Sequence, residues 1–418
     1  MQANISSLFM RLQQVPLVRL VQSTLQKLFP FALFGSVIAA FRKTVLDDEG
    51  FINNVFNVPA WFPYYHAVNA YAQTLTQLTL GILAILSAYY MAMLTAKKPY
   101  HYEAGITAAL AFIVLLNPHR NPRLALPSFS GMTPFGIHGL LLGLLFGYLI
   151  GWFWNWLAKR QKRHMHQEKV TSATSGVILV LGAAFLINVS LSVVAKQFNI
   201  STSSFSVSGL ASQGSFLMTL LGSIGTSMLR WFGLTGFFDF DSSFTSGAAN
   251  SNLMYALEHH SPWHVPYPFT EETLYDSFGI YAGVGGGLAL IVALWLFTRD
   301  KRTLQISALA SGPAFFGSSE ALLIGLPVLL NPLYLIPFVL APAVNVIIAA
   351  GLVALKVIPP AIYPVPIGTP GPLIGFIGSG GNIATFVFGF GLFVLDVLIY
   401  MPFVKLDNKM KATRTSES

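Results

Sequence analysis

Long stretches without any charged residue constrain this chain more than any other feature. Residues 124–158, 170–194 and 277–298 contain none, and a helix needs only about 20 apolar residues to cross a bilayer. Backbone polar groups in lipid must be satisfied within the protein, so the choice is between helices and a closed barrel. The apolar residues are continuous rather than alternating, which favours helices. The sequence therefore predicts an all-α, polytopic membrane protein.

The composition supports this prediction and limits the alternatives. Hydrophobic residues make up 54% of the 418 residues and charged residues 10%, whereas a soluble domain carries roughly 25% charged residues. The net charge of +8 does not indicate nucleic acid, because most basic residues gather between apolar stretches, as in the cytoplasmic loops of membrane proteins. The chain has no cysteine, which excludes disulfides, thiolate metal sites and a cysteine nucleophile.

Hydropathy predicts about ten transmembrane helices. A cytoplasmic N-terminus then places both termini and the main basic clusters inside, as the positive-inside rule requires. These clusters lie at 97–98, 159–163, 299–302 and 405–414. Two smaller basic groups, at 42–43 and 120–123, fall on the outside. The predicted helices cover residues 24–42, 73–95, 103–118, 135–158, 173–195, 208–229, 231–249, 277–298, 332–356 and 383–404.

Glycine and proline break two apolar segments in the C-terminal half. Residues 304–332 contain Gly312-Pro313, and residues 358–382 contain Pro370-Gly371-Pro372. At membrane depth such backbone is tolerated only where it is buried in protein or lines a cavity. Paired broken segments point to the binding site of a transporter. We therefore predict two re-entrant hairpins, with surface loops of low polarity as the alternative.

Glu320 is the only charged residue between Arg302 and Lys356. An ionisable side chain inside the membrane is costly and marks a functional site by default. The alternative is a loop glutamate that reaches water near a hairpin tip. Asp396 is a second isolated acid. It either has a function, or it lies near the inner end of its helix and there snorkels to the interface or pairs with a basic group.

Two further patterns resemble binding sites, one for a nucleotide and one for a metal ion. The glycine-rich run 283–287 opens a predicted helix and follows no strand, so it indicates close helix packing rather than a nucleotide site. His259, His260 and His264 lie near Glu258 but lack the fixed spacing of a metal site. We therefore predict no metal centre.

Residues 316–338 read FGSSEALLIGLPVLLNPLYLIPF. This stretch resembles the signature of the membrane (IIC) component of the lactose/cellobiose/diacetylchitobiose-type phosphotransferase family, which reads close to FGINEP-IIFGLPIVLNPIYFIPF. Other stretches resemble that family in order along the chain, so the resemblance covers almost its whole length. These stretches are 29–36, 270–278 with 283–288, and 399–405.

The resemblance implies a homodimer in the bacterial inner membrane. Residues 1–200 would form a scaffold, residues 201–405 would hold the sugar between two hairpins, and residues 406–418 would be a cytoplasmic tail. The substrate would be a mono- or disaccharide of the cellobiose, lactose or chitobiose kind. A separate IIB protein with a phosphocysteine would phosphorylate it. This chain would then take part in phosphotransfer without a phosphorylated residue of its own, which leaves its standing as an enzyme open. No cofactor is expected.

The resemblance also assigns the site. Glu320 matches the family's glutamate and is the predicted catalytic residue. The family has asparagine before that glutamate, where this chain has Ser319, and its FGIHG motif corresponds to residues 232–236, where Thr235 replaces the histidine. Its W-T-T-P motif corresponds to residues 367–370, which lack the aromatic residue. The predicted sugar-binding residues are Glu320, Ser319, Thr235, Thr369 and Asn331.

Other functions stay open at this point. A divergent relative could move or sense a sugar without phosphoryl coupling, because Thr235 cannot replace an imidazole as a base. A secondary transporter could use Glu320 to couple transport to protons or ions. A structural or bacteriocin-receptor role is a third alternative.

Overall fold

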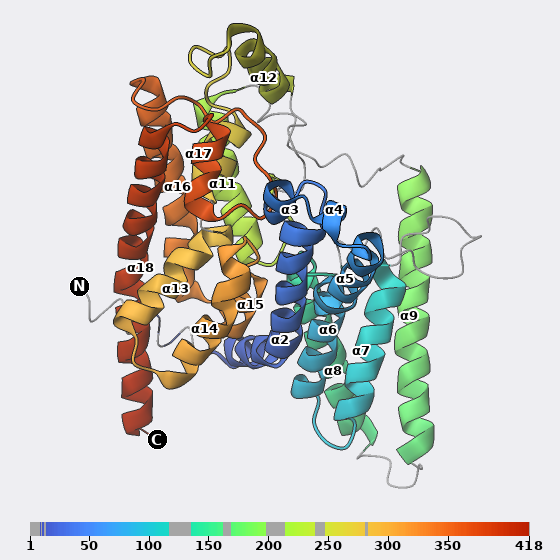
Figure 1. Ribbon diagram of the computed structural model, residues 1–418. Helices are drawn as coiled ribbons and strands as arrows, with labels where there is room; N and C mark the ends of the chain where they lie inside the picture. Colours follow the sequence, from blue (N-terminus) through green and yellow to red (C-terminus); the bar gives the residue numbers. More distant parts are fainter. Residues whose placement is uncertain are drawn as a thin grey trace. The chain divides into compact units, whose positions relative to one another are not determined.

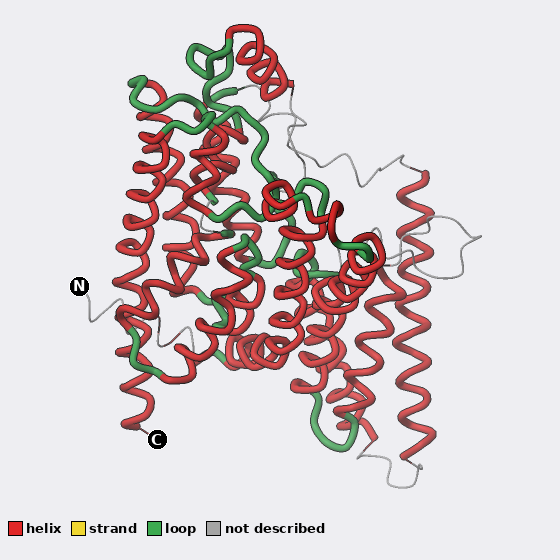
Figure 2. The backbone as a smooth tube through the Cα atoms, viewed as in Figure 1, coloured by secondary structure: helices red, strands yellow, loops and turns green. Residues whose placement is uncertain are grey.

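The computed structural model describes residues 14–116, 135–161, 169–197, 214–238, 247–280 and 283–417, together with Phe9 and Arg11. Within these residues the regular structure is helical, apart from an isolated bridge between Gly50 and Ile367 and single bridge residues at Gly139 and Leu234 (Figures 1 and 2). The all-α prediction is therefore confirmed. The chain divides into two compact units, residues 14–32 with 77–205, and residues 1–13 with 33–76 and 206–418.

The unit of residues 14–32 and 77–205 is a bundle of long helices. Its main helices are α6 (Leu83–Thr95), α7 (His101–Leu116), α8 (Leu140–Gln161) and α9 (Lys169–Gln197). Glycines recur every fourth residue along α8, at Gly143, Gly147 and Gly151, and so lie on one face. A Cβ atom at Gly143 would clash with the carbonyl of Ala84 on α6, and one at Gly147 with that of Ala88. Small residues thus let the two backbones approach closely, as in membrane helix pairs.

Asparagine side chains form hydrogen bonds with the free backbone groups at the ends of these helices. Asn155 on α8 accepts a hydrogen bond of 2.8 Å from the backbone N–H of Lys97 and donates one of 2.8 Å to the carbonyl of Thr95. Asn188 on α9 donates to the carbonyl of Val114 at 2.7 Å. The last carbonyls of a helix have no partner within it, so these bonds stabilise the ends of α6 and α7.

The second unit contains the helices of residues 206–418 and those of residues 33–76. It includes α11 (Phe216–Trp231), α12 (Gly247–His259), α13 (Gly287–Phe297), α14 (Lys301–Phe315), α15 (Glu320–Gly325), α16 (Pro332–Ala354), α17 (Gly371–Gly378), α18 (Ile383–Glu417), α3 (Phe51–Phe56) and α4 (Val58–Trp61). The end of α2 (Pro16–Phe41), most of α5 (Tyr65–Thr79) and the π-helical turn η5 (Glu272–Gly279) complete it. Helix α18 packs against α13, α16 and α17 (Figure 1). Phe278, Val346 and Leu392 lie in the hydrophobic core between η5, α16 and α18.

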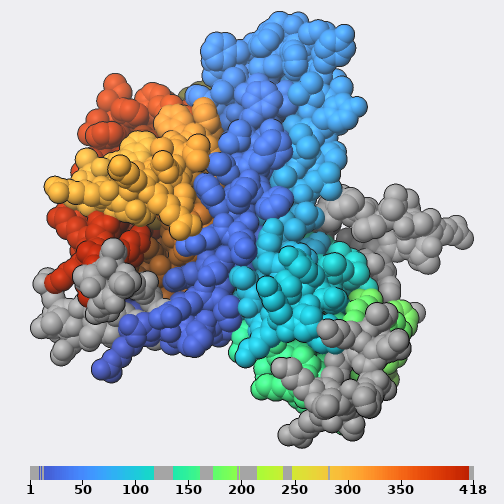
Figure 3. Space-filling view, turned by 90° about the horizontal axis from the view of Figure 1, so that it is seen from below, coloured from blue at the N-terminus to red at the C-terminus, as the bar shows by residue number. Residues whose placement is uncertain are grey.

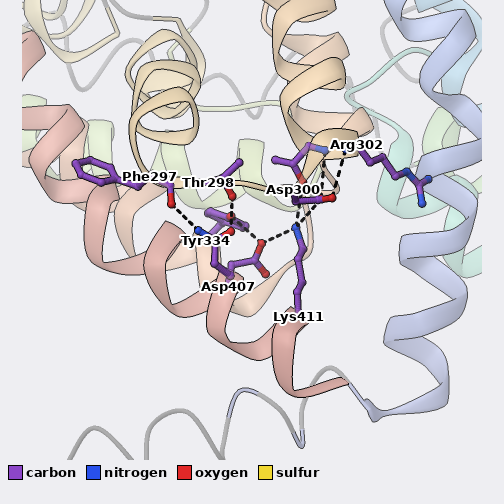
Figure 4. Close-up of polar contacts among 9 residues, drawn as sticks. Phe297, Thr298, Asp300, Arg302, Tyr334, Asp407 and Lys411 are labelled. Carbon is purple, nitrogen blue, oxygen red and sulfur yellow. Dashed lines mark hydrogen bonds and ion pairs between the residues drawn. The ribbon is translucent and has the colours of Figure 1, made fainter. Parts of the chain in front are cut away.

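A polar cluster fixes the C-terminal part of α18 (Figure 4). Lys411 Nζ lies 2.9 Å from Oδ2 of Asp407 and 3.9 Å from Oδ2 of Asp300. The hydroxyl of Tyr334 donates to Asp407 Oδ2 at 3.3 Å, and Lys411 Nζ donates to Thr303 at 3.2 Å. The cluster therefore ties the end of α18 to the start of α14 and the start of α16.

Large apolar side chains cover the outside of several helices. On α2, Phe34 is 50% exposed and Val37 is 45% exposed, and this helix lies at the surface in Figure 3. On α9, Ile178 and Leu186 are 66% and 65% exposed. A water-soluble monomer rarely exposes so much contiguous apolar surface, whereas a protein in lipid does.

Seven described helices are long and apolar enough to cross a membrane, and α7 is a shorter apolar helix. They match eight of the predicted spans. A further predicted span, 208–229, corresponds to the 16-residue helix α11. The seven long helices are Pro16–Leu46, Tyr65–Thr95, Leu140–Arg160, Ala173–Val194, Glu272–Phe297, Pro332–Ala354 and Ile383–Thr413.

The predicted span at 231–249 is wrong. Helix α11 ends at Trp231, Gly233 adopts a φ of 71°, and residues 232–238 form turns and a loop. The hydroxyl of Thr226 accepts hydrogen bonds from the backbone N–H groups of Phe237 and Phe238 at 3.1 and 3.2 Å, which folds this loop back onto α11. Helix α12 begins at Gly247. The predicted topology of ten crossings therefore lacks structural support for this span. The side of the membrane on which each terminus lies stays a prediction.

Both glycine- and proline-rich segments are broken, as predicted. In the first, Gly317 adopts a φ of 85° between α14 and α15, and α15 has only 6 residues. In the second, residues 358–370 are not helical, α17 has 8 residues, and Gly380 and Gly381 adopt φ values of 74° and 84°. That these segments are re-entrant in a membrane stays a prediction.

The predicted domain boundaries also stay a prediction. The compact units differ from the proposed halves, because residues 1–13 and 33–76 group with residues 206–418, and residues 201–205 group with residues 14–32 and 77–200. The proposed tail, 406–418, is not a separate segment in its described part, because α18 runs on to Glu417.

Candidate functional site

Glu320 is the first residue of α15 and is half-buried. The hydroxyl of Ser318 donates a hydrogen bond of 2.6 Å to its Oε2 atom. Ser318 and Ser319 are both buried, at 6% and 2% exposure. Hydrogen bonds to an ionised carboxylate are short and strong, so Ser318 fixes one oxygen of Glu320. The other oxygen has no hydrogen-bond partner among the described residues and remains available to a ligand.

The same turn is tied to α2. The backbone N–H of Ala321, one of the first N–H groups of α15, donates to the hydroxyl of Ser36 at 3.2 Å, and Ser36 is fully buried. Sequence reasoning assigned no role to Ser36 or Ser318. The available signal was that Ser36 ends the family-like stretch 29–36, and that Ser318 lies two residues before Glu320.

The glycine-rich run lies against Ser319. A Cβ atom at Gly283 would lie 3.6 Å from the Ser319 side chain, and one at Gly287 would lie 3.0 Å from Ser319 Cβ. A Cβ atom at Gly285, where φ is 64°, would clash with the ring of Phe338 on α16. Only glycine combines this backbone conformation with such close contacts. The predicted role of the run in close packing is therefore confirmed.

A buried polar cluster lies behind the glycine run. The Nδ2 atom of Asn345 on α16 donates to Oδ2 of Asp396 on α18 at 2.9 Å, and both side chains are buried. The hydroxyl of Tyr400 donates to the carbonyl of Gly285. A Cβ atom at Gly286 would lie 3.9 Å from Asp396 Oδ2. Asp396 is therefore buried and accepts a hydrogen bond from an amide, whereas the non-functional expectations were a side chain that snorkels to the interface or pairs with a basic group.

Residues 36–51 contact both broken segments. Ser36 bonds to the start of α15, as described above. The backbone of residue Ile367 donates to the carbonyl of Glu49 at 2.8 Å and accepts from the N–H of Phe51 at 2.9 Å. A Cβ atom at Gly368, where φ is 75°, would clash with Thr44. The N-terminal stretch thus positions the Glu320 turn and the segment that contains Thr369.

The predicted site residues fall into three places. Ser319 and Glu320 lie together at the glycine run. Asn331 caps α16, because its side chain accepts from the N–H of Leu333 at 3.2 Å. Thr235 is exposed in the loop after α11, and the backbone of Leu330 donates to the carbonyl of Trp231 at 3.2 Å, which joins these two loops.

Thr369 occupies a place of its own. It is buried, and its hydroxyl donates to the carbonyl of Pro366 at 2.7 Å. Among the described residues, no hydrogen bond joins Thr369 or Thr235 to Glu320. The structure therefore brings Ser319 and Glu320 together, whereas the roles of Thr235, Thr369 and Asn331 toward a sugar stay predictions.

The Glu320 site can accept hydrogen bonds from a hydroxyl-bearing ligand. Its polar groups are one carboxylate and the neutral hydroxyls of Ser318 and Ser319, and no ion pair to Glu320 is present among the described residues. A carboxylate with a free oxygen accepts a hydrogen bond from a ligand hydroxyl and can act as its base. The polar cluster at the C-terminal part of α18 differs, because its charged and polar side chains already bind one another and the backbone. That cluster therefore stabilises the fold rather than binding a ligand.

A comparison with protein families gives one match over most of the chain. The family described as "Phosphotransferase system, EIIC" matches residues 23–342. The cellobiose-specific EIIC component of Lactococcus lactis subsp. lactis (strain IL1403) is 34% identical over 139 residues, which are 33% of this chain and 28% of that protein. The lactose-specific EIICB component of Staphylococcus aureus (strain N315) is 39% identical over 126 residues, which are 30% of this chain and 22% of that protein.

These alignments cover less than a third of the length of either relative. Among solved structures, the transporter ChbC, the IIC component from the N,N'-diacetylchitobiose-specific phosphotransferase system, is similar at 19% identity and a TM-score of 0.41. The comparison covers 97% of this chain and 96% of that one.

Proposed function

Because the chain belongs to the phosphotransferase system EIIC family, whose family model spans residues 23–342, we propose that it is the sugar-translocating subunit of such a system. The substrate is a mono- or disaccharide of the cellobiose, lactose or chitobiose kind. The observation that carries this proposal is Glu320, a half-buried carboxylate at the start of a broken helix, with one oxygen held by Ser318 and the other available.

The sugar binds between the two broken segments. Its hydroxyls donate to Glu320 and exchange hydrogen bonds with Ser319, Thr235, Thr369 and Asn331. Support comes from residues 36–51, which contact the Glu320 turn and the Thr369 segment alike. Carbohydrate recognition needs several such polar groups in one place, because each hydroxyl that loses water must find a new partner.

A separate cytoplasmic IIB protein with a phosphocysteine phosphorylates the sugar. This chain has no cysteine, so it contributes the translocation path and a positioned substrate, while the phosphoryl group comes from the partner. The subunit works as a homodimer in the bacterial inner membrane. Both termini lie in the cytoplasm, an orientation supported by the basic residues Lys405, Lys409 and Lys411 near the end of α18.

Uptake measurements with a panel of labelled sugars test this function. Cells that produce the full chain and a cognate IIB protein should accumulate one of these sugars in phosphorylated form, dependent on phosphoenolpyruvate. The panel contains cellobiose, lactose, N,N'-diacetylchitobiose and glucose. Accumulation of free sugar that follows the proton gradient alone would contradict the proposal and support secondary transport. Absence of uptake for the whole panel would also contradict it.

One observation favours a second candidate function. Thr235 is exposed and stands where the resembling family has a histidine, and a hydroxyl cannot take a proton at neutral pH. A relative that moves or senses a sugar without phosphoryl coupling would need no base at this position. Entry of unphosphorylated sugar up to its outside concentration, independent of both phosphoenolpyruvate and the proton gradient, would identify this alternative.

A further inference from the structure

A cavity lies at the tip of the second broken segment, where α17 gives way to α18. Its volume is about 570 Å³, and it is lined by His260, Trp263, Tyr363, Ser379, Asn382 and the turn 380–381, among others. In Figure 1, α12, the end of α17 and the start of α18 lie at the same end of this unit. Glu320, Ser318 and Ser319 are not among the residues that line the cavity. The cavity is therefore distinct in its lining from the Glu320 site.

We propose that this cavity, the tip pocket, is a second binding site, which takes one ring of a neutral sugar. The volume falls within the range of small-molecule sites, roughly 300–1,000 Å³. The ligand class of this site rests on the proposed function, because a second sugar site has a role only if the protein transports a sugar.

Hydrogen bonds and close packing fix the backbone and side chains that line the tip pocket. The backbone N–H groups of Ile362 and Tyr363 both donate to the carbonyl of Gly378, at 2.7 and 2.9 Å. A Cβ atom at Gly380, where φ is 74°, would lie 2.9 Å from the Tyr363 ring. The ring therefore packs directly over the glycine turn. Asn382 accepts from the N–H of Thr385 at 3.1 Å, which holds its side chain at the start of α18.

Several polar groups in the pocket have no protein partner. Among the described residues, no hydrogen bond is made by the indole N–H of Trp263, the hydroxyl of Tyr363, the Nδ2 atom of Asn382 or the ring of His260. Polar groups of this kind bind either water or a ligand. The four residues line one pocket, so a ligand with several hydroxyls can exchange hydrogen bonds with them there.

The lining also selects against charged ligands. No Asp, Glu, Lys or Arg side chain lines the pocket. The Nζ atom of Lys356 lies 3.2 Å from Nε2 of His264, and neither residue lines the pocket. A phosphate or carboxylate would find no permanently charged partner in the lining, whereas a pyranose ring matches both features of the site. Its C–H faces pack on the aromatic rings of Trp263 and Tyr363, and its hydroxyls reach the unpaired polar groups.

Cysteine protection tests the tip pocket, since the chain has no cysteine of its own. Pro262 lines the pocket, and Pro266 is exposed on the same loop without lining it. Pro262→Cys and Pro266→Cys would each be made in the full chain, purified into lipid nanodiscs and labelled with a maleimide. Labelling rates would be compared with cellobiose, with lactose, with the linear polyol sorbitol and without additive. Each variant would also be made in a Glu320→Gln background.

The expected result is that one of the two sugars slows labelling at position 262, by about tenfold at ten times its dissociation constant. Labelling at position 266 should not change, sorbitol should have no effect, and protection should persist with Glu320→Gln. Adding Trp263→Ala should raise the half-protecting concentration about tenfold.

Protection that disappears with Glu320→Gln would overturn the proposal, because it would arise from the Glu320 site. Equal rates with and without either sugar would overturn it as well. Neither readout requires transport, so protection at 262 without uptake would retain the tip pocket and reject the transport function.

Discussion

The hydroxyl of Ser318 donates a hydrogen bond of 2.6 Å to Oε2 of Glu320. This bond leaves the other oxygen to the ligand and orients the carboxylate. Ser318→Ala removes the donor, and a hydrogen bond to a charged group is worth about 1.5–3 kcal/mol. We expect sugar affinity, measured by calorimetry on the purified protein, to fall about tenfold while the melting temperature changes little. Ser311→Ala is the matched control, because its hydroxyl donates only within α14, to Ala308. Unchanged affinity in Ser318→Ala would show that this bond does not position Glu320.

The bond between Asn345 and Asp396 makes a prediction about stability. Asn345→Leu leaves a buried carboxylate without this donor, which should cost on the order of 3 kcal/mol. The melting temperature in detergent should therefore fall. The double variant Asn345→Leu, Asp396→Leu replaces both partners with apolar groups and should recover most of the loss. Asn54→Leu, on the exposed helix α3, serves as the control. A single variant that melts like the parent would refute this role for the pair.

Asp300 makes a prediction about pH. Its carboxylate accepts hydrogen bonds from the N–H groups of Arg302 and Thr303 at 3.3 and 3.2 Å, which caps α14. The hydrogen bond from the Thr303 side chain lowers the pKa of Asp300 below its ordinary value of 3.8, against the opposing effect of burial. A lowered pKa in the folded state contributes stability above the unfolded pKa, and this contribution is lost as the pH falls through the folded pKa.

Asp300→Ala should therefore destabilise the protein by about 1 kcal/mol at neutral pH, as expected for a lost N-cap. The difference in melting temperature from the parent should shrink as the pH is lowered below 3.8. Glu258→Ala, at an exposed position on α12, controls for the loss of an acid. A difference for Asp300→Ala that stays constant as the pH falls well below 3.8 would contradict the capping role of the charge.

Thr235 makes a prediction about coupling. It is exposed in the loop after α11, and its hydroxyl can share a hydrogen bond but cannot act as a base near neutral pH. General-base assistance is worth roughly 10²–10⁴-fold in rate. Thr235→His should therefore raise the rate of sugar phosphorylation in membranes supplied with phosphoenolpyruvate and a cognate IIB protein. Thr235→Asn controls for size. A parent that already works at full rate, with no gain from the histidine, would show that the imidazole is dispensable here.

Hydropathy was sufficient to predict the long helices and the two broken segments, because both follow from local composition. Long apolar stretches form helices in lipid, and glycine and proline interrupt them. The same reasoning failed at 231–249, where the average apolarity is high but Gly233 adopts a left-handed conformation. An average over a window does not register a single residue that ends a helix.

The candidate site was only partly predictable for a different reason. Glu320 stood out because it is an isolated charge, which is visible in the sequence alone. Ser36 contributes through a bond to a residue 285 positions away, and Asn345 reaches Asp396 across 51 positions. Such pairs depend on how helices pack, and a single sequence carries no direct signal for them.

The proposal that Glu320 is the centre of the sugar site is tested most directly by binding to Glu320→Gln. This substitution keeps the size of the side chain and removes its charge, and Glu258→Gln on α12 is the matched control. Sugar affinity would be measured by calorimetry on purified protein that carries Trp263→Ala, which weakens the tip pocket, after the melting temperature has shown that both variants are folded. We expect Glu320→Gln to weaken binding at this site by at least about tenfold, while Glu258→Gln binds like the parent. A folded Glu320→Gln protein that binds sugar with the parent's affinity would contradict the account.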